Sequence, residues 1–224
     1  MTIARADSSP ARHSALRIGV LGGTFDPIHI GHLAIAEECR VRLPLDLVLF
    51  APAGIPPHKR RQSITSIHHR VAMVELAIES NPHFELSRVD VDREGPSYTA
   101  DTLALLQAEY EAKGERAELY LIVGMDSLVD IRKWYRPAEV LARCTVAAVS
   151  RPGLEAPDLA ALESVLEGAS RRVVVVNGPR LDISATDLRA RVAAGLPIRY
   201  LVPDAVERYI RDHGLYRPVG SATL

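Results

Sequence analysis

The chain has 224 residues, of which 47% are hydrophobic and 25% are charged, and its formal net charge is -1. This length suits one large α/β domain or two small ones, and the near-neutral charge argues against a general nucleic-acid binder, whose domain is usually strongly basic. No run approaches the roughly 20 apolar residues that a membrane helix needs, so we expect neither nucleic-acid nor membrane partners.

The composition of the N-terminal segment and the two cysteines lead us to expect a cytoplasmic protein. Residues 1–15 lack the apolar centre of a signal peptide and are expected to form a disordered extension, followed by one domain over 16–216 and a tail over 217–224. Cys39 and Cys144 show no CxxC or metal-site spacing and are expected to be small core or near-surface residues, which suits a reducing compartment. Neither a monomer nor a homo-oligomer is excluded.

Strand and helix patterns alternate along the chain. In chain order, we predict a strand at 16–21, a helix at about 28–43, a strand at 45–51, a helix at 66–80, a strand at 84–91, a helix at 99–113 that stops at Gly114, strands at 119–123 and 145–149, a helix at 158–168, a strand at 173–176, and closing helices at 184–194 and 203–213. This order predicts an α/β fold with a doubly wound, parallel, Rossmann-like sheet. Ligands bind such sheets at the carboxyl ends of the strands.

The turn after the first strand, GGTFDP at 22–27, suits the binding of an anion. Its glycines let the backbone approach a phosphate closely, and Thr24 adds a hydroxyl donor. Asp26 followed by Pro27 is typical of a helix N-cap with proline at the first helical position. A helix that begins here would direct its free N–H groups and its positive dipole end at a phosphate.

Two histidines follow this turn. His29 and His32 are three residues apart and share one face of the predicted helix. Gly31 between them has no side chain, so a ligand can come close to the helix there. Two imidazoles beside a helix N-terminus suit a developing phosphate charge. A purely structural turn and a two-histidine metal site are the alternatives, although no third metal ligand is evident nearby. A dinucleotide-binding GxGxxG motif is not present.

The string GGTFDPIHIGH at 22–32 resembles the HxGH signature of the nucleotidyltransferase superfamily. More narrowly, it is similar to the pattern GGxFDPxHxGH of the bacterial nicotinate mononucleotide adenylyltransferases. In that family the two histidines contact the phosphates of ATP and stabilise the transition state, which the resemblance carries over to His29 and His32. The resemblance also implies that the turn residues bind ATP, namely Gly22, Gly23, Thr24 and Phe25.

The proline-rich loop PAGIPPHK at 52–59 follows the second strand. Lys59 could reach a phosphate as a point charge or could be an ordinary solvated surface lysine. The loop resembles the PxxxPPHK segment of the same family. That resemblance implies that His58 and Lys59 lie beside the mononucleotide, near the phosphates, with Lys59 among the catalytic groups.

The segment PSYTADTL at 96–103 reads first as the start of a helix, with Thr99 and its neighbours as caps. It is similar to the family's PSYTxDTL segment, which implies that Tyr98 and Thr99 flank the nicotinate ring. A second segment, GMDSL at 124–128, resembles a GxDSL pattern that precedes a tryptophan.

In that second segment Gly124 and Asp126 are the candidate ligand contacts. Asp126 could cap a helix or bind a ribose diol, as acidic residues at strand ends do in α/β folds. Trp134, the single tryptophan, could be a packing residue. A planar pyridine ring needs an aromatic face, however, and the resemblance implies that Trp134 stacks on nicotinate with Tyr135 beside it.

The late segment ISATDLR at 183–189 is close to a capping box and could be only a well-capped helix start. It also combines the hydroxyls of Ser184 and Thr186 with a helix N-terminus and Arg189, which together suit an anion. In the family that it resembles, the residues of the corresponding pattern ISSTxIR bind the triphosphate of ATP. Ala185 stands here in place of a serine, so a hydroxyl contact at that position is lost. The resemblance spans about residues 16–216.

The resemblance implies adenylyl transfer from ATP to nicotinate mononucleotide, giving deamido-NAD and pyrophosphate. His29, His32, Lys59 and Arg189 would be the catalytic groups, and catalysis would be positioning plus charge stabilisation. No metal is expected on the protein, because Mg²⁺ would arrive with ATP and be held by its phosphates. The alternatives are an HxGH nucleotidyltransferase with another acceptor, such as nicotinamide mononucleotide or phosphopantetheine, and a non-catalytic nucleotide sensor. The missing GxGxxG disfavours a dehydrogenase.

Overall fold

The computed structural model describes residues 15–56, 64–150, 162–164 and 167–218. The expected extension at 1–15, apart from Ala15, lies outside these residues, as do most of the helix predicted at 158–168 and both His58 and Lys59. Residues 162–164, which belong to that predicted helix, are helical.

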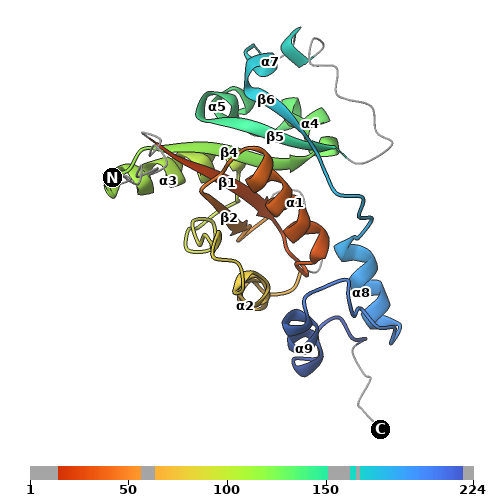
Figure 1. The fold of residues 1–224 in the computed structure, drawn as a ribbon. Helices are drawn as coiled ribbons and strands as arrows, with labels where there is room; N and C mark the ends of the chain where they lie inside the picture. Colours follow the sequence, from red (N-terminus) through yellow and green to blue (C-terminus); the bar gives the residue numbers. More distant parts are fainter. Residues whose placement is uncertain (1–14, 57–63, 151–161, 165–166, 219–224) are drawn as a thin grey trace, which may run out of the picture.

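Six parallel strands form one sheet in the order β3-β2-β1-β4-β5-β6 (Figure 1). The strands are β1 (Leu16–Gly23), β2 (Leu47–Pro52), β3 (Phe84–Leu86), β4 (Ala117–Gly124), β5 (Cys144–Ser150) and β6 (Val173–Asn177). The chain builds outward from β1 to β3 on one side, and then returns to the other side of β1 to add β4, β5 and β6. The order therefore reverses between β1 and β4, where a doubly wound sheet opens a crevice at its carboxyl edge. The predicted α/β fold is confirmed.

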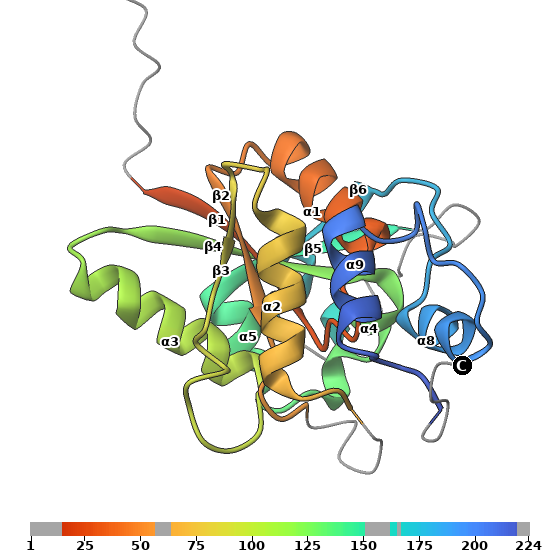
Figure 2. The same cartoon turned by 90° about the horizontal axis from the view of Figure 1, so that it is seen from below.

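Helices cover both faces of this sheet. They are α1 (Ile30–Arg42), α2 (Ile67–Ile78), α3 (Thr99–Ala112), α4 (Met125–Val129), α5 (Pro137–Arg143), α7 (Ala169–Arg172), α8 (Ala185–Ala193) and α9 (Asp204–Asp212), with a short 3-10 helix η2 (Ile131–Lys133). Side chains of α1, α2, α8 and α9 pack in one apolar core, and those of α3, α4, α5 and α7 pack in a second core on the opposite face. Figure 2 looks onto α2 and α9, which lie side by side.

Strand residues alternate between the two cores. In β2, Val48 and Phe50 face the first core while Leu49 and Ala51 face the second. Successive side chains of a strand point to opposite faces, so a strand that is covered on both sides reads as a continuous apolar run. This is why the short apolar runs of the sequence predict the central strands well.

Three features of the sequence prediction need correction. The strand predicted at 84–91 ends at Leu86, because the chain turns at once: the backbone N–H of Ser87 donates to Phe50, and those of Val91 and Asp92 donate to the carbonyl of Arg88. The first helix begins at Ile30 with His29 as its N-cap, three residues later than a cap at Asp26 would give. Helices α4, α5 and α7 were not expected, since they are too short to show a helical period.

Asp26 is not a cap because its side chain is engaged elsewhere. Its carboxylate is 4% exposed and accepts hydrogen bonds from the backbone of Thr65 and from the hydroxyl of Tyr216. The turn around it has Phe25 at φ 49° and a cis peptide bond between Asp26 and Pro27. Cys39 and Cys144, which we expected to be small core or near-surface residues, are both buried and carry free thiols.

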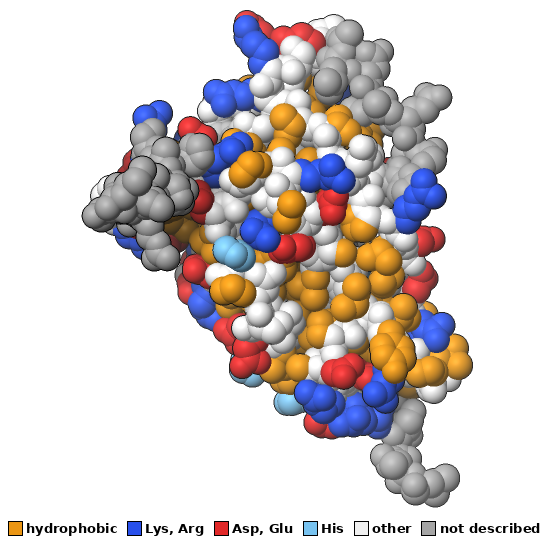
Figure 3. Space-filling view, viewed as in Figure 1, with side chains coloured by type: hydrophobic (Ala, Val, Ile, Leu, Met, Phe, Trp, Pro, Cys, Tyr) orange, Lys and Arg blue, Asp and Glu red, His pale blue; other side chains and the backbone are white. Residues whose placement is uncertain are grey.

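The surface carries charges of both signs. On the face seen in Figure 3, Lys and Arg side chains are interspersed with Asp and Glu and with uncharged side chains. None of the helices in the described ranges is long and apolar enough to cross a membrane.

Candidate active site

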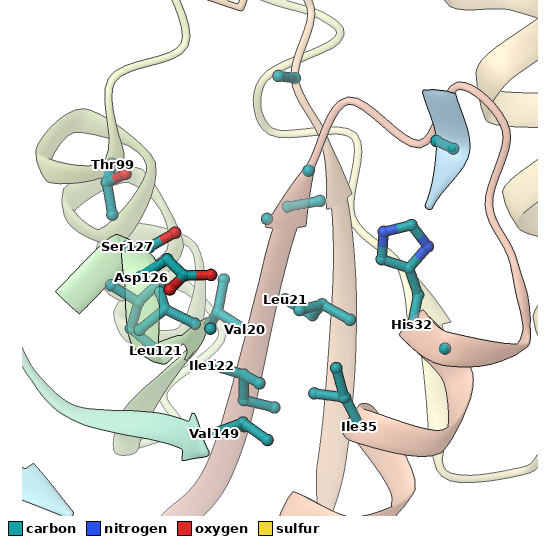
Figure 4. A pocket seen from close by; sticks show the side chains of 18 of the residues that line it. Val20, Leu21, His32, Ile35, Thr99, Leu121, Ile122, Asp126, Ser127 and Val149 are labelled. Atoms are coloured by element: carbon teal, nitrogen blue, oxygen red, sulfur yellow. The ribbon is translucent and has the colours of Figure 1, made fainter. Parts of the chain in front are cut away.

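A cleft of about 1000 Å³ opens at the carboxyl edge of the sheet, where the strand order reverses. The ends of β1, β4 and β5 form its floor, and the start of α1 stands on one side of β1 while the starts of α3 and α4 stand on the other (Figure 4). Of the residues singled out in the sequence, those that line this cleft are Gly22, Gly23, His29, His32, Tyr98, Thr99, Gly124, Asp126, Trp134, Tyr135, Ser184, Thr186 and Arg189. Segments more than 150 residues apart in the sequence therefore converge on one cleft.

The two histidines of the opening motif stack on each other at the start of α1. The ring centroids of His29 and His32 are 3.7 Å apart with an interplanar angle of 26°. His32 also meets the ring of Phe25 edge-on, with centroids 5.1 Å apart. Gly31 permits this stack, because a Cβ there would lie 3.0 Å from Nδ1 of His29. The pair is thus held as one packed unit facing the cleft.

A backbone hydrogen bond fixes the orientation of the His32 ring. The N–H of His29 donates to Nδ1 of His32 over 3.2 Å. Because Nδ1 accepts, the proton of the neutral ring lies on Nε2. His32 therefore presents an N–H donor that can serve a phosphate oxygen, as a preorganised donor does for developing charge.

Thr24 and Phe25, predicted to bind ATP, lie beneath the cleft and do not line it. Phe25 is 2% exposed and packs between His32 and Phe50 in the first core. The carbonyl of Thr24 accepts a hydrogen bond of 2.8 Å from the guanidinium of Arg70. The side chain of Phe25 thus supports the histidine ring rather than facing a ligand, and Gly22 and Gly23 are the turn residues that reach the cleft.

Helix α8 brings the late motif to the same side of the cleft as the histidines. Ser184 is its N-cap and accepts a hydrogen bond of 3.1 Å from the N–H of Asp187, so the predicted capping role is confirmed. Arg189 donates from Nη1 to the carbonyl of Asp26 over 2.7 Å and from Nη2 to the hydroxyl of Thr186 over 3.3 Å. Arg189 is thereby fastened to the turn that follows β1 while its guanidinium lines the cleft.

Aromatic side chains gather on the other half of the cleft. Tyr98, the N-cap of α3, stacks on Tyr135 with centroids 4.4 Å apart and an interplanar angle of 29°. Trp134 is half-buried and packs against the second core while it lines the cleft. Asp126 lies in the first turn of α4, whose N-cap is Gly124, so its exposed carboxylate does not serve as the cap. Figure 4 places Thr99, Asp126 and Ser127 together on this side of β1.

Several cleft residues were not singled out in the sequence. Lys133, Ser127, Ser150 and Asp90 line the cleft. Asp90 is 5% exposed and accepts hydrogen bonds of 2.7 Å from Thr102 and from Arg93, so it anchors the start of α3 beneath the tyrosine pair. Ser150 comes directly after the strand predicted at 145–149, and Ser127 lies four residues after the one predicted at 119–123, so nearness to a strand end was the available signal for both.

The donor set of the cleft is suited to phosphate oxygens. Its histidine half offers imidazole, guanidinium, hydroxyl and backbone N–H groups, which are the groups that bind anions. No set of three His, Cys, Asp or Glu residues is gathered for metal binding within the part of the chain that the structure describes. A divalent ion that is held mainly by the phosphates of a nucleotide fits these residues, since such an ion needs few protein ligands.

Comparison with known proteins gives a consistent result. The family profile described as cytidylyltransferase-like matches residues 20–191. A relative from Roseiflexus sp. (strain RS-1), named probable nicotinate-nucleotide adenylyltransferase, is 52% identical over 204 residues, which are 91% of this chain and 100% of the relative. A protein of the same name from Thermomicrobium roseum is 49% identical over 91% of this chain and 92% of its own length.

Solved structures share the fold. The nicotinic acid mononucleotide adenylyltransferase of Plasmodium falciparum complexed with NaAD has a TM-score of 0.72 to this chain, covering 90% of this chain and 97% of that one at 17% identity. At that identity the likeness speaks for the architecture, while the two bacterial relatives carry the assignment. The chain therefore belongs to the cytidylyltransferase-like family and, within it, to the nicotinate-nucleotide adenylyltransferases.

Proposed function

We propose that the chain transfers the adenylyl group of ATP to nicotinate mononucleotide, giving deamido-NAD and pyrophosphate. The observation that carries this proposal is the division of one cleft into two halves. One half gathers His29, His32 and Arg189 around a helix N-terminus, and the other holds aromatic rings and the carboxylate of Asp126. The first half suits a polyphosphate, and the second suits a ribose that carries a planar ring.

In the proposed reaction, a phosphate oxygen of the mononucleotide attacks the α-phosphorus of ATP in line. A new P–O bond forms as the bond to the β-phosphate oxygen breaks, and pyrophosphate leaves with its electron pair. The attacking phosphate is already anionic, so no general base is required. Catalysis then comes from positioning and from donors aimed at the charge that develops on phosphate oxygens.

The donors of the histidine half have distinct tasks in this scheme. His32 donates through Nε2–H, since its Nδ1 is occupied by the backbone of His29. Arg189 brings a permanent positive charge, held in place by its bond to the carbonyl of Asp26. Ser184 and Thr186 add hydroxyls at the start of α8. We expect Mg²⁺ to be carried by the ATP phosphates, where it neutralises the charge of the leaving pyrophosphate.

The acceptor half binds the mononucleotide in this proposal. Asp126 accepts hydrogen bonds from the ribose diol, and Trp134 offers a face to the pyridine ring beside the stacked Tyr98 and Tyr135. His58 and Lys59, which lie outside the described residues, are proposed contacts of the phosphates on the basis of the sequence motif alone. We also propose a cytoplasmic location, because ATP and free thiols belong to a reducing compartment.

Turnover with several acceptors tests this proposal. The purified chain is incubated with ATP, Mg²⁺ and one acceptor, and both pyrophosphate and the dinucleotide are measured. We expect kcat/KM for nicotinate mononucleotide to exceed that for nicotinamide mononucleotide by about tenfold or more, and phosphopantetheine to give no product. Turnover with phosphopantetheine, or ATP binding without pyrophosphate release for any acceptor, would contradict the proposal.

A further inference from the structure

A buried carboxylate beneath the ATP half of the cleft is held by a residue of the turn that follows α9. The hydroxyl of Tyr216 donates to Oδ1 of Asp26 over 2.7 Å. The backbone N–H of Thr65 donates to the other carboxylate oxygen over 3.2 Å. Asp26 is 4% exposed, so both bonds form away from water and the side chain is fixed from two sides.

The same aspartate also holds a cleft residue through its backbone. The carbonyl of Asp26 accepts the 2.7 Å hydrogen bond from Nη1 of Arg189. Next to it, the buried guanidinium of Arg70 donates to the carbonyls of Thr24, Thr65 and Gly54 at 2.8, 3.0 and 3.2 Å. The turn after β1, the segment that leads into α2 and the arginine of α8 are therefore joined at Asp26.

Tyr216 is built to remain a donor at this junction. It follows α9 with a left-handed φ of 64°, and its ring packs against the first core, where the hydroxyl also lies 3.9 Å from Sδ of Met73. Burial, and then the neighbouring charge of Asp26, raise the pKa of Tyr216 far above its ordinary value of 10.0. The hydroxyl thus keeps its proton over the whole range in which the protein works.

We propose that Tyr216 is a positioning residue for the ATP half of the cleft, acting through Asp26 on the turn after β1 and on Arg189. It touches no substrate itself. The proposal rests on the proposed binding of ATP in that half. Its physical basis is that the carbonyl of Asp26 holds Arg189 on the histidine side of the cleft, while the aromatic half is anchored separately through Asp90.

The test compares two tyrosines of the C-terminal region. Tyr216→Phe removes only the hydroxyl that holds Asp26 and leaves the packed ring in place. Tyr209→Phe is the matched control, because Tyr209 is also partly buried and its hydroxyl lies 2.9 Å from Nδ1 of His69, outside the cleft. For each variant we measure kcat, the KM for each substrate, the Kd for ATP, the Kd for nicotinate mononucleotide and the melting temperature.

We expect Tyr216→Phe to weaken ATP binding and to lower kcat/KM for ATP, each about tenfold, as loss of a buried hydrogen bond to a charged group does. The Kd for nicotinate mononucleotide should stay within twofold of wild type, and Tyr209→Phe should change no kinetic or binding constant beyond twofold. The proposal would be overturned if the variant bound both substrates equally more weakly. It would also be overturned if the melting temperature fell while ATP binding at the working temperature stayed unchanged, because Tyr216 would then only stabilise the fold.

A double-mutant cycle checks the route of the effect. If Tyr216 acts through Asp26, then Tyr216→Phe should cost less than twofold in ATP affinity when Asp26→Ala, which leaves no side-chain acceptor for the hydroxyl, is already present. Additive losses would contradict the route. Failure of the proposed function would look different: wild-type protein would bind ATP but release no pyrophosphate with any acceptor. In that case, the ATP affinities of wild type and the variants would still test the role of Tyr216.

Discussion

The chemistry of His32 depends on which of its nitrogens carries the proton. Its Nδ1 accepts the N–H of His29, and its ring is fixed between the face of His29 and the edge of Phe25. A ring that is held on three sides keeps one rotamer and one tautomer, so little reorganisation is needed when charge develops on a phosphate. Phe25, which does not line the cleft, contributes by supporting this ring.

Trp134 allows the acceptor half to be tested on its own. Trp134→Ala removes the half-buried ring that lines the cleft. We expect KM for nicotinate mononucleotide to rise about tenfold while KM for ATP stays within twofold, since the lost contact is a stacking surface for the pyridine ring. Tyr200→Ala is the control, because Tyr200 is 79% exposed and does not line the cleft. An equal rise in both KM values would contradict the assigned role.

Arg70 connects three segments of the chain from a buried position. Arg70, a residue of α2, is 2% exposed and donates to three backbone carbonyls, which belong to the turn after β1, the loop after β2 and the segment that leads into α2. Burial lowers its pKa from the ordinary value of 12.5, and the charge of Asp26 opposes that shift. The guanidinium therefore replaces regular secondary structure in satisfying this irregular backbone.

Replacing Arg70 should unfold the region that carries the ATP half. Arg70→Met keeps the bulk of the side chain and leaves three buried carbonyls without their donor, so we expect the free energy of unfolding to fall by about 3–5 kcal/mol in urea denaturation. Arg42→Met is the control, because Arg42 forms an exposed ion pair with Glu38 and such pairs contribute about 0–1 kcal/mol. Equal effects of the two substitutions would contradict this role of Arg70.

Sequence reasoning reached the elements whose signal is local. The strands at the centre of the sheet are continuous apolar runs, and the long helices α1, α2 and α3 show a clear period. Thirteen of the residues that it singled out line the cleft, and most of these stand near the end of a strand or the start of a helix. Short elements such as α4 and α7 lack the length for a period.

What sequence reasoning could not reach depends on contacts between distant segments. Asp26 followed by Pro27 has the local signature of a helix start, but tertiary hydrogen bonds from Thr65 and Tyr216 hold the carboxylate elsewhere. Likewise, nothing local shows that Phe25 faces the core, since its direction follows from the left-handed φ of 49° in a crowded turn. Partners 39 and 190 residues away leave no periodic trace in the sequence.

The molecule as a whole consists of two apolar cores on the faces of one sheet, with its cleft at the edge where the strand order reverses. Cys39 lies in the first core and Cys144 in the second. Burial raises the pKa of each thiol from 9.0 to about 12. Both thiols therefore stay protonated in the folded protein at a pH that ionises them in the unfolded chain.

This difference in thiol pKa between the folded and the unfolded chain should destabilise the fold in alkaline solution. Between pH 9 and 12 the unfolded chain has lost the thiol protons that the folded chain keeps, so the free energy of unfolding should fall by about 1.4 kcal/mol per pH unit for each thiol. Chemical denaturation at pH 8, 9 and 10 measures the slope. The double variant Cys39→Ala and Cys144→Ala should flatten it, and an unchanged slope would contradict the assignment to these two groups.

The claim on which the mechanism depends is that the His29 and His32 pair stabilises the charge that develops on the phosphates of ATP during adenylyl transfer. Steady-state turnover of His32→Ala with ATP and nicotinate mononucleotide tests it most directly, with His68→Ala on the exposed face of α2 as the control. We predict that kcat of His32→Ala falls by about 10²–10³ with a melting temperature close to that of wild type, and that His68→Ala keeps wild-type turnover. A well-folded His32→Ala enzyme whose kcat lies within threefold of wild type would contradict the account.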